Sequence, residues 1–229
     1  DPIHVPRDAD DAMLEALRLN LEHALNAATR RAYELAGADV RRATPLGQLA
    51  AENPPAPGLR LKIYRSGTSA LRAAAPLLLK YRERQGKEDP ERRAERLGQA
   101  AKERPQGPLA WVHAASVGET NAVLPLIAGL LDAEPSLHVL LTTGTTTSAR
   151  LAGQRLPQRA FHQFVPLDTA QHAGAFLDHW HPDLAIFTES EIWPNLVLES
   201  SRRKIAMALV NARMSPRSMK RWRRNACFQ

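Results

Sequence analysis

Short apolar runs alternate with helix-patterned segments over the second half of this 229-residue chain. The runs cover residues 109–116, 138–144, 161–166, 183–190 and 205–211. Helical spacing of apolar residues predicts helices between them, at 119–133, 147–156, 170–180 and around 195–203. Short apolar strands joined by helices of about ten to fifteen residues are typical of βαβ units, in which the strands are parallel and covered on both faces. The sequence therefore predicts an α/β fold with a doubly wound, Rossmann-like parallel sheet.

Polar residues gather directly after these predicted strands. In open α/β sheets, ligands bind outside the carboxyl ends of the strands, so the residues at those positions are candidates for a functional site. They comprise Ser116, Gly118, Glu119, Thr143, Asp168, Glu189, Glu191 and Arg213. One edge of the sheet is thus predicted to collect several carboxylates, hydroxyl groups and an arginine.

Helix capping is the structural alternative for several of these residues. A Ser/Thr cluster such as 145–147 is typical of an N-cap, and we expect Asp168 to cap the helix that follows it. Glu119 at a helix start is stabilised by the helix dipole. Capping does not explain Gly118, which leaves room for a ligand, or Glu189, an acid placed directly after a buried strand. No glycine-rich dinucleotide or P-loop pattern follows any strand, which argues against a nicotinamide or P-loop nucleotide site.

Positive charge is concentrated in two segments. Residues 59–105 hold thirteen Lys/Arg against six Asp/Glu, and residues 213–224 add six cations and no acid. Such segments indicate a polyanionic partner, either nucleic acid or an anionic membrane surface. The alternative is an exposed helix supported by pairs such as Glu88 with Arg92.

An apolar segment at 68–79 lies inside the first basic region and is too short to cross a bilayer. With its cationic rim it resembles an interfacial anchor, and a helix packed on its own domain is the other interpretation. The predicted contacts to membrane or phosphate are Arg65, Lys80, Arg82 and Arg84.

Between residues 59 and 224 a series of motifs follows in the order RQGKEDPERRAERLG, WVHAASVGE, TTGTTTSA, HQFVPLD, ESEIWPNL and NARMS. This series resembles the N-terminal half of Kdo transferases, which transfer 3-deoxy-D-manno-octulosonic acid. The resemblance implies the acceptor-binding domain of a two-domain GT-B glycosyltransferase, which moves Kdo from CMP-Kdo to the lipid A precursor during lipopolysaccharide assembly. It further implies an enzyme at the cytoplasmic face of the bacterial inner membrane, peripheral or monotopic, that uses no cofactor and no metal.

Carried over residue by residue, the resemblance makes Glu119 the general base of an inverting transfer and Glu189 the acid that supports the transition state. Both roles agree with the chemistry. A carboxylate near the acceptor hydroxyl can take its proton, and a second anion stabilises the positive charge that develops on the sugar. The residues expected to bind or support the acceptor are Ser116, Gly118, Thr143, Glu191 and Arg213.

The predicted organisation has four parts: a helical segment at 1–37, a proline-rich linker at 38–58, basic membrane-proximal helices at 59–105 and the Rossmann-like domain at 106–229. Residues 1–37 resemble the tail of a lysophospholipid acyltransferase-like protein, which suggests a fusion. The resemblance to Kdo transferases also implies a C-terminal nucleotide-sugar domain with a catalytic lysine after Gln229, so we expect this chain alone not to turn over.

Two other functions remain open from the sequence: a non-catalytic basic domain that binds nucleic acid or an anionic membrane, and an inactive gene-fusion fragment. Against nucleic acid, only 5% of the residues are aromatic and no known nucleic-acid motif occurs. We therefore predict no nucleic-acid partner. The single Cys227 excludes a disulfide within the chain.

Overall fold

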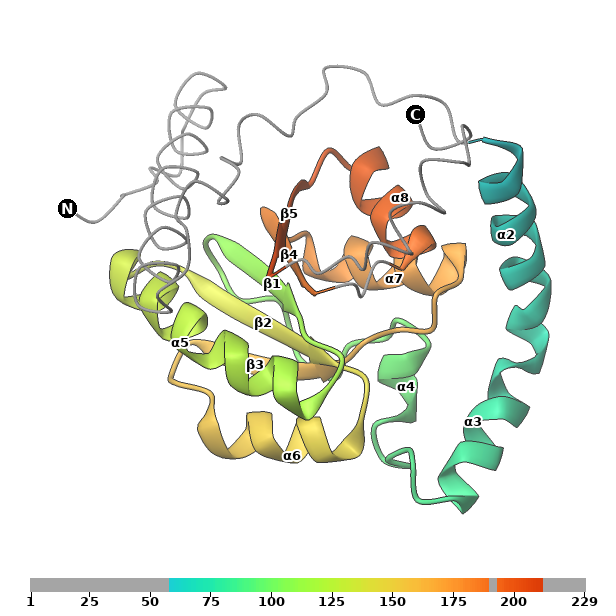
Figure 1. Ribbon diagram of the computed structural model, residues 1–229, viewed down its shortest axis with the longest axis horizontal. Helices are drawn as coiled ribbons and strands as arrows, with labels where there is room; N and C mark the ends of the chain where they lie inside the picture. The colour runs from blue at the N-terminus through green and yellow to red at the C-terminus, as the bar shows by residue number, and fades with distance from the viewer. Residues whose placement is uncertain (1–57, 190–192, 212–229) are drawn as a thin grey trace.

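The computed structural model describes residues 58–189 and 193–211, so the predictions for residues 1–57, Glu191 and Arg213 lie outside the described residues (Figure 1). The predicted parallel sheet is confirmed: five strands lie in the order β3-β2-β1-β4-β5, and every neighbouring pair is parallel. The strands are β1 (Leu109–His113), β2 (His138–Thr143), β3 (Ala160–Phe164), β4 (Leu184–Thr188) and β5 (Ala206–Val210). Four of them fall inside the predicted apolar runs, and β3 begins at Ala160, one residue before its predicted run.

Helices cover both faces of the sheet, which confirms the doubly wound arrangement (Figure 1). One face packs against α5 (Val117–Ala133) and α6 (Thr146–Arg155), with Val123, Ile127 and Ala152 in the core. The other face packs against α7 (Ala170–Trp180) and α8 (Pro194–Arg202), with Phe176 and Leu196 in a second core. Strands β1 and β4 are buried along their whole length, as expected for a strand between two helical layers.

The strand order reverses between β1 and β4. From β1 the chain proceeds outward through β2 to β3, and it then returns to place β4 on the other side of β1. Such a topological switch point leaves a crevice between the loops that leave the two strands, and ligands of open α/β sheets bind there. After β1, Ser116 precedes α5 and Glu119 lies in its first turn, while β4 ends at Thr188 and is followed by Glu189.

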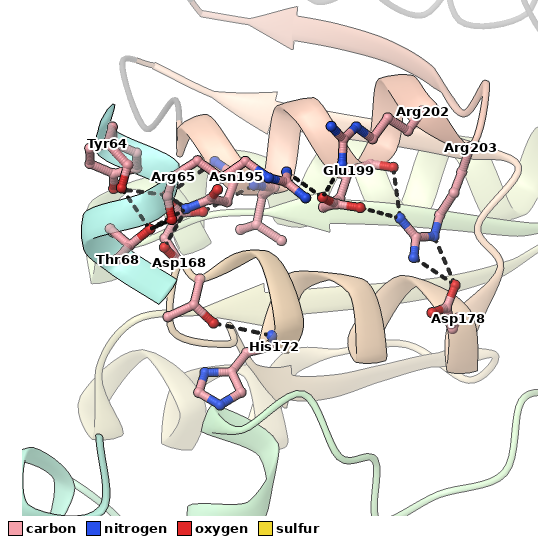
Figure 2. Close-up of polar contacts among 12 residues, drawn as sticks. Tyr64, Arg65, Thr68, Asp168, His172, Asp178, Asn195, Glu199, Arg202 and Arg203 are labelled. Carbon is pink, nitrogen blue, oxygen red and sulfur yellow. Dashed lines mark hydrogen bonds and ion pairs between the residues drawn. The ribbon is translucent and has the colours of Figure 1, made fainter. Parts of the chain in front are cut away.

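The segment before the sheet forms a long helical arm that comprises α2 (Leu59–Ala70), the 3-10 turn η3 (Leu71–Ala74) and α3 (Ala75–Arg84) (Figure 1). Polar contacts join α2 to the α7–α8 side of the domain (Figure 2). Tyr64 donates a hydrogen bond of 2.9 Å to Asp168, and Thr68 accepts one of 3.0 Å from the Asn195 side chain. Burial and the hydrogen bond to Asp168 raise the pKa of Tyr64 to about 12, so its hydroxyl remains a donor at neutral pH.

Glu199 on α8 is the second point of attachment of the arm. Its carboxylate pairs with Arg65 of α2 at 2.5 Å, with Arg203 at 2.7 Å and with Arg202 at 3.2 Å (Figure 2). Burial alone would raise the pKa of Glu199, but the bonds from Arg203 and Arg65 outweigh it and lower that pKa. The carboxylate therefore stays ionised and holds α2 against α8.

The prediction that Asp168 caps the helix following it is wrong. Thr169 is the N-cap of α7, and its hydroxyl accepts a hydrogen bond from the His172 amide. Asp168 instead accepts hydrogen bonds from the amides of Asn195 and Leu196, at 3.2 and 3.0 Å, at the start of α8. It thereby supplies the cap that Trp193, at the N-cap position of α8, does not make with its own side chain.

A basic segment around α4 (Arg93–Arg96) lies against the end of the sheet and is partly buried (Figure 1). The predicted pair of Glu88 with Arg92 is wrong, because Glu88 pairs with Arg96 and Arg82, at 2.8 and 2.7 Å. Arg96 is 4% exposed and also donates to the carbonyl oxygens of Val165 and Gly144, at 3.1 and 2.7 Å. The sequence of this basic segment is typical of a solvated charged helix, but part of it is buried and is hydrogen-bonded to the loops that follow β2 and β3.

The pair of Arg92 and Glu95 covers the outer edge of β3. Arg92 donates to the carbonyl oxygen of His162 at 3.1 Å, and Glu95 accepts from the amide of Phe164 at 2.7 Å. The two side chains also bind each other through two hydrogen bonds of 2.8 Å. Backbone groups at the edge of the sheet are thus satisfied by side chains.

Candidate active site

Glu119 lies in the first turn of α5, at the switch point, and its carboxylate is held by three donors. Ala115 donates its backbone amide to Oε2 at 2.8 Å, and Ser116 donates its hydroxyl to Oε1 at 2.8 Å. Thr188, at the end of β4, lies 3.0 Å from Oε2. Ser116 is also the N-cap of α5 and accepts a hydrogen bond of 3.3 Å from the Glu119 amide. The Ser-x-x-Glu spacing thus forms a variant of the capping box, in which the glutamate accepts from the amide of Ala115, the residue before the N-cap, and not from the amide of the N-cap itself.

The three bonds fix the direction of the Glu119 carboxylate. Each carboxylate oxygen has two in-plane lone pairs. Among the described residues, two donors lie at Oε2 and one at Oε1, so Oε1 keeps one lone pair without a partner from this part of the chain. The residue is 7% exposed, but the neighbouring Ser116 and Gly118 are exposed. The arrangement presents one basic oxygen beside a polar, open stretch of backbone.

Glu189 follows β4 in a left-handed backbone conformation, with φ of 54°. Asn211, directly after the neighbouring strand β5, has φ of 52°, and its amide nitrogen lies 3.4 Å from Glu189 Oε1. Arg159, His181 and Lys204, away from the switch point, also have positive φ, so this conformation does not by itself mark a functional site. The sequence predicts that Glu189 is buried because it follows a buried strand. In the structure Glu189 is partly exposed, and Glu119 is the buried carboxylate of the two.

Gly118 has no structural requirement for glycine among the described residues. A Cβ built at this position would meet only Ser116 Oγ, at 3.9 Å, which is ordinary van der Waals contact. Its φ is outside the left-handed region. Room for a ligand therefore remains the proposed reason for this glycine.

Thr143 is fully buried, and its hydroxyl pairs with His162 Nε2 at 2.9 Å. The predicted acceptor-supporting role of Thr143 stays a prediction, because its hydroxyl is bound to His162 on β3. Sequence reasoning missed two further residues that meet here: His113, buried at the end of β1 with Nδ1 3.0 Å from Thr142 Oγ1, and Thr188, which reaches Glu119 across the sheet. Only the adjacency of β1 and β4 brings Thr188 to Glu119, and a single sequence does not reveal strand order.

Two of the four cations predicted to touch a membrane or phosphate are engaged within the chain. Arg65 pairs with Glu199, and Arg82 pairs with Glu88 at 2.7 Å. Lys80 and Arg84 are exposed. The membrane or phosphate contact stays a prediction for all four residues.

A cavity of about 520 Å³ lies along β3, with Phe161, His162, Trp180 and Lys102 among its lining residues. It includes none of the residues at the switch point, so its size does not make it the candidate active site.

Within residues 58–189 and 193–211, no group of His, Cys, Asp or Glu side chains is arranged as metal ligands are.

Two buried histidines predict loss of stability in acid. Burial, as the first cause, lowers the pKa of His113 to about 4, and burial together with Arg92 lowers the pKa of His162 to about 3. Both are neutral in the folded chain, whereas the unfolded chain protonates them below about pH 6.5. We expect the free energy of unfolding to fall by a few kcal/mol, on the order of magnitude, between about pH 6.5 and pH 4.

Urea unfolding at a series of pH values measures this dependence. A His162→Gln variant should show a shallower fall, and His181→Gln, at an exposed position, should match the parent chain. A flat stability profile in the parent chain would contradict the assignment.

The parallel sheet with helices on both faces defines a Rossmann-like α/β domain, and its candidate ligand site lies at the carboxyl edge of the strands. The family described as "3-Deoxy-D-manno-octulosonic-acid transferase (kdotransferase)" matches residues 91–229. This match covers more than half of the sequence, and the chain belongs to the Kdo transferase family. The predicted family is thus confirmed.

Curated relatives carry the same description. The chain is 38% identical over 161 residues to a probable 3-deoxy-D-manno-octulosonic acid transferase, mitochondrial, of Arabidopsis thaliana, with 70% of this chain and 36% of the relative covered. It is 43% identical over 122 residues to the 3-deoxy-D-manno-octulosonic acid transferase of Rickettsia typhi, with 53% and 26% covered. It is 37% identical over 135 residues to that of Haemophilus influenzae, with 58% and 31% covered. The chain spans about a third of the length of these relatives, and no solved structure matched it.

Proposed function

We propose that this chain forms the acceptor-binding part of a glycosyltransferase that transfers Kdo from CMP-Kdo to the lipid A precursor, with inversion at the anomeric carbon. The single observation that carries the proposal is the Glu119 carboxylate at the switch point, which has three donors among the described residues, two at Oε2 and one at Oε1. Family membership supplies the class of reaction. The donor, the acceptor and the stereochemistry are part of the proposal.

In this mechanism, Glu119 Oε1 takes the proton from the acceptor hydroxyl as that oxygen attacks the anomeric carbon of Kdo. The bond from the anomeric carbon to the CMP phosphate breaks, and CMP leaves with the electron pair. Positive charge that develops on the sugar is stabilised by the nearby Glu189 carboxylate. Gly118 and Ser116 line the position of the acceptor, next to Oε1.

A transfer assay tests the proposal. The chain is joined to the remaining, donor-binding part of a relative such as the Haemophilus influenzae enzyme, and transfer of Kdo from CMP-Kdo to lipid A precursor is measured by mass spectrometry. We expect a product one Kdo unit heavier or more. A folded joined protein that hydrolyses CMP-Kdo but never extends the acceptor would contradict the acceptor assignment.

The helical arm is proposed to hold this domain at an anionic membrane surface. Large apolar side chains are exposed along it: Leu59 72%, Ile63 62%, Leu77 73%, Leu78 48% and Tyr81 60%. Exposed cations accompany them, namely Lys62, Arg72, Lys80, Arg84 and Lys87. In the described part of the chain, no helix has the length and apolar content to span a bilayer. An apolar surface with a cationic rim suits an interfacial contact.

Vesicle binding tests the arm. Replacement of Lys80, Arg84 and Lys87 by Gln is expected to lower cosedimentation with vesicles of anionic phosphatidylglycerol by about tenfold or more, since each cation near such a surface contributes about 1 kcal/mol. The matched control replaces Lys102, Arg150 and Lys204, which are exposed away from the arm. Equal loss in both triple variants would show that only net charge matters and would contradict a role of the arm.

A further inference from the structure

Thr188 ends β4 with a hydroxyl placed between two acceptors on other elements. Its Oγ1 lies 2.9 Å from the carbonyl oxygen of His113, on β1, and 3.0 Å from Glu119 Oε2, on α5. The side chain is 3% exposed, so no bulk solvent competes for this hydroxyl. A threonine hydroxyl carries a single proton, and it can donate to only one of the two acceptors at full strength.

The other two donors to Glu119 differ from Thr188 in this respect. The Ala115 amide is a fixed backbone donor to Oε2, and the Ser116 hydroxyl bonds Oε1 within the cap of α5. Of the three donors, Thr188 alone lies far from Glu119 in sequence, 69 residues away at the end of β4. Its hydroxyl also has a second acceptor in reach, the His113 carbonyl oxygen.

We propose that Thr188 is a positioning residue for Glu119. The Thr188 hydroxyl donates to Glu119 Oε2 while the carboxylate is charged, and it turns to the His113 carbonyl oxygen when Oε1 has gained a proton. This inference rests on the proposed function, because it concerns the same base. In the charged state, Thr188 and Ala115 occupy Oε2 and direct the free lone pair of Oε1 outward. After the acceptor O–H bond breaks and its proton joins Oε1, the negative charge that favoured the Thr188 bond is gone. The hydroxyl then has the His113 carbonyl as a ready partner, so neither state leaves it buried and unpaired.

Two other titratable groups lie at this point of the sheet. His113 is fully buried, and since burial lowers its pKa to about 4 it is neutral at the pH of an assay. Glu189 follows Thr188 directly and is partly exposed. Neither side chain is hydrogen-bonded to the Glu119 carboxylate, so Thr188 is the side chain on β4 that bonds this carboxylate directly, and the other partner of its hydroxyl is the backbone carbonyl of His113.

A Thr188→Val variant removes the hydroxyl and keeps the shape of the side chain. In the joined transferase we expect kcat to fall by about 10- to 100-fold, the size of one lost hydrogen bond to a charged group, with KM for both substrates within about twofold. Thr188→Ser should restore kcat to within about threefold. Thr120→Val is the matched control, because its buried hydroxyl donates to the Ser116 carbonyl, which also accepts from the Thr120 amide.

A second readout uses the chain itself and needs no activity. Carbon-13 NMR of labelled glutamate follows the pH at which the Glu119 carboxyl takes up its proton, with Glu119→Gln to assign the signal. Hydrogen bonds to a carboxylate favour its charged form, so this pH should rise in Thr188→Val and return in Thr188→Ser. An unchanged titration with unchanged kcat would overturn the role of Thr188. A shifted titration in a joined protein that transfers no Kdo would leave that role in place and overturn the proposed function.

Discussion

Replacing Glu119 with Gln is expected to lower kcat for Kdo transfer in the joined protein by about a thousandfold, the middle of the range for loss of a general base. Gln keeps the length of the side chain but cannot take a proton from the acceptor hydroxyl. The effect should fall on kcat with little change in KM, because the acceptor is bound mainly by the surrounding site. Initial rates at saturating CMP-Kdo and acceptor give both values.

The Glu119→Gln variant must also be shown to fold, since the carboxylate is part of the cap of α5. A Gln side chain places an NH2 group toward at least one of the donors that now bind the carboxylate. Circular dichroism and thermal unfolding show whether this change at the cap destabilises the fold, and so separate a loss of stability from a loss of catalysis. Glu103→Gln, at an exposed position, is the control. A well-folded Glu119→Gln protein with parental kcat would remove Glu119 from the role of base.

Replacing Arg96 with Met is expected to lower the free energy of unfolding of the chain by about 3–5 kcal/mol, as the loss of one partner from a buried ion pair does. Arg96 and Glu88 are about equally buried, with side chains 5% and 4% exposed. The Met side chain fills similar space but leaves the Gly144 and Val165 carbonyl oxygens without this donor. Urea unfolding at pH 7 measures the change.

Arg93 provides the matched control for this experiment. It lies in the same short helix and pairs with Glu83, but its own side chain is 40% exposed, and ion pairs with an exposed partner contribute less than fully buried ones. Arg93→Met should therefore have a free energy of unfolding close to that of the parent chain. The free energy of unfolding of Arg96→Lys should lie between those of the two Met variants, because Lys keeps the charge but lacks the planar guanidinium. Equal stability of both Met variants would show that Arg96 does not anchor the segment.

The strands were predictable because a parallel sheet covered on both faces needs continuous apolar runs, and runs such as 109–113 and 184–188 are buried throughout. The capping of α6 by Thr145 follows local rules and was also predicted from the sequence. Glu119 was a candidate because it follows a predicted strand, and its role as base came from the resemblance to Kdo transferases; that Ser116 caps α5 was not predicted.

Contacts across the fold could not be predicted in this way. Asp168 caps α8, 27 residues away, because strand order places the loop after β3 beside that helix. Thr188 reaches Glu119 for the same kind of reason. Arg96 reads as one cation in a solvated run, and only the packing of α4 against the sheet shows that its guanidinium is buried.

The side-chain pair of Arg92 and Glu95 on the outer edge of β3 has a consequence for how this domain meets other chains. An edge strand with free amide and carbonyl groups is a template on which a strand of another molecule can form, and it is a common origin of aggregation. Here a guanidinium and a carboxylate occupy those groups at His162 and Phe164, where the first two hydrogen bonds of an added strand would form. The same two residues that fasten α4 to the sheet thus also block its extension by a further strand.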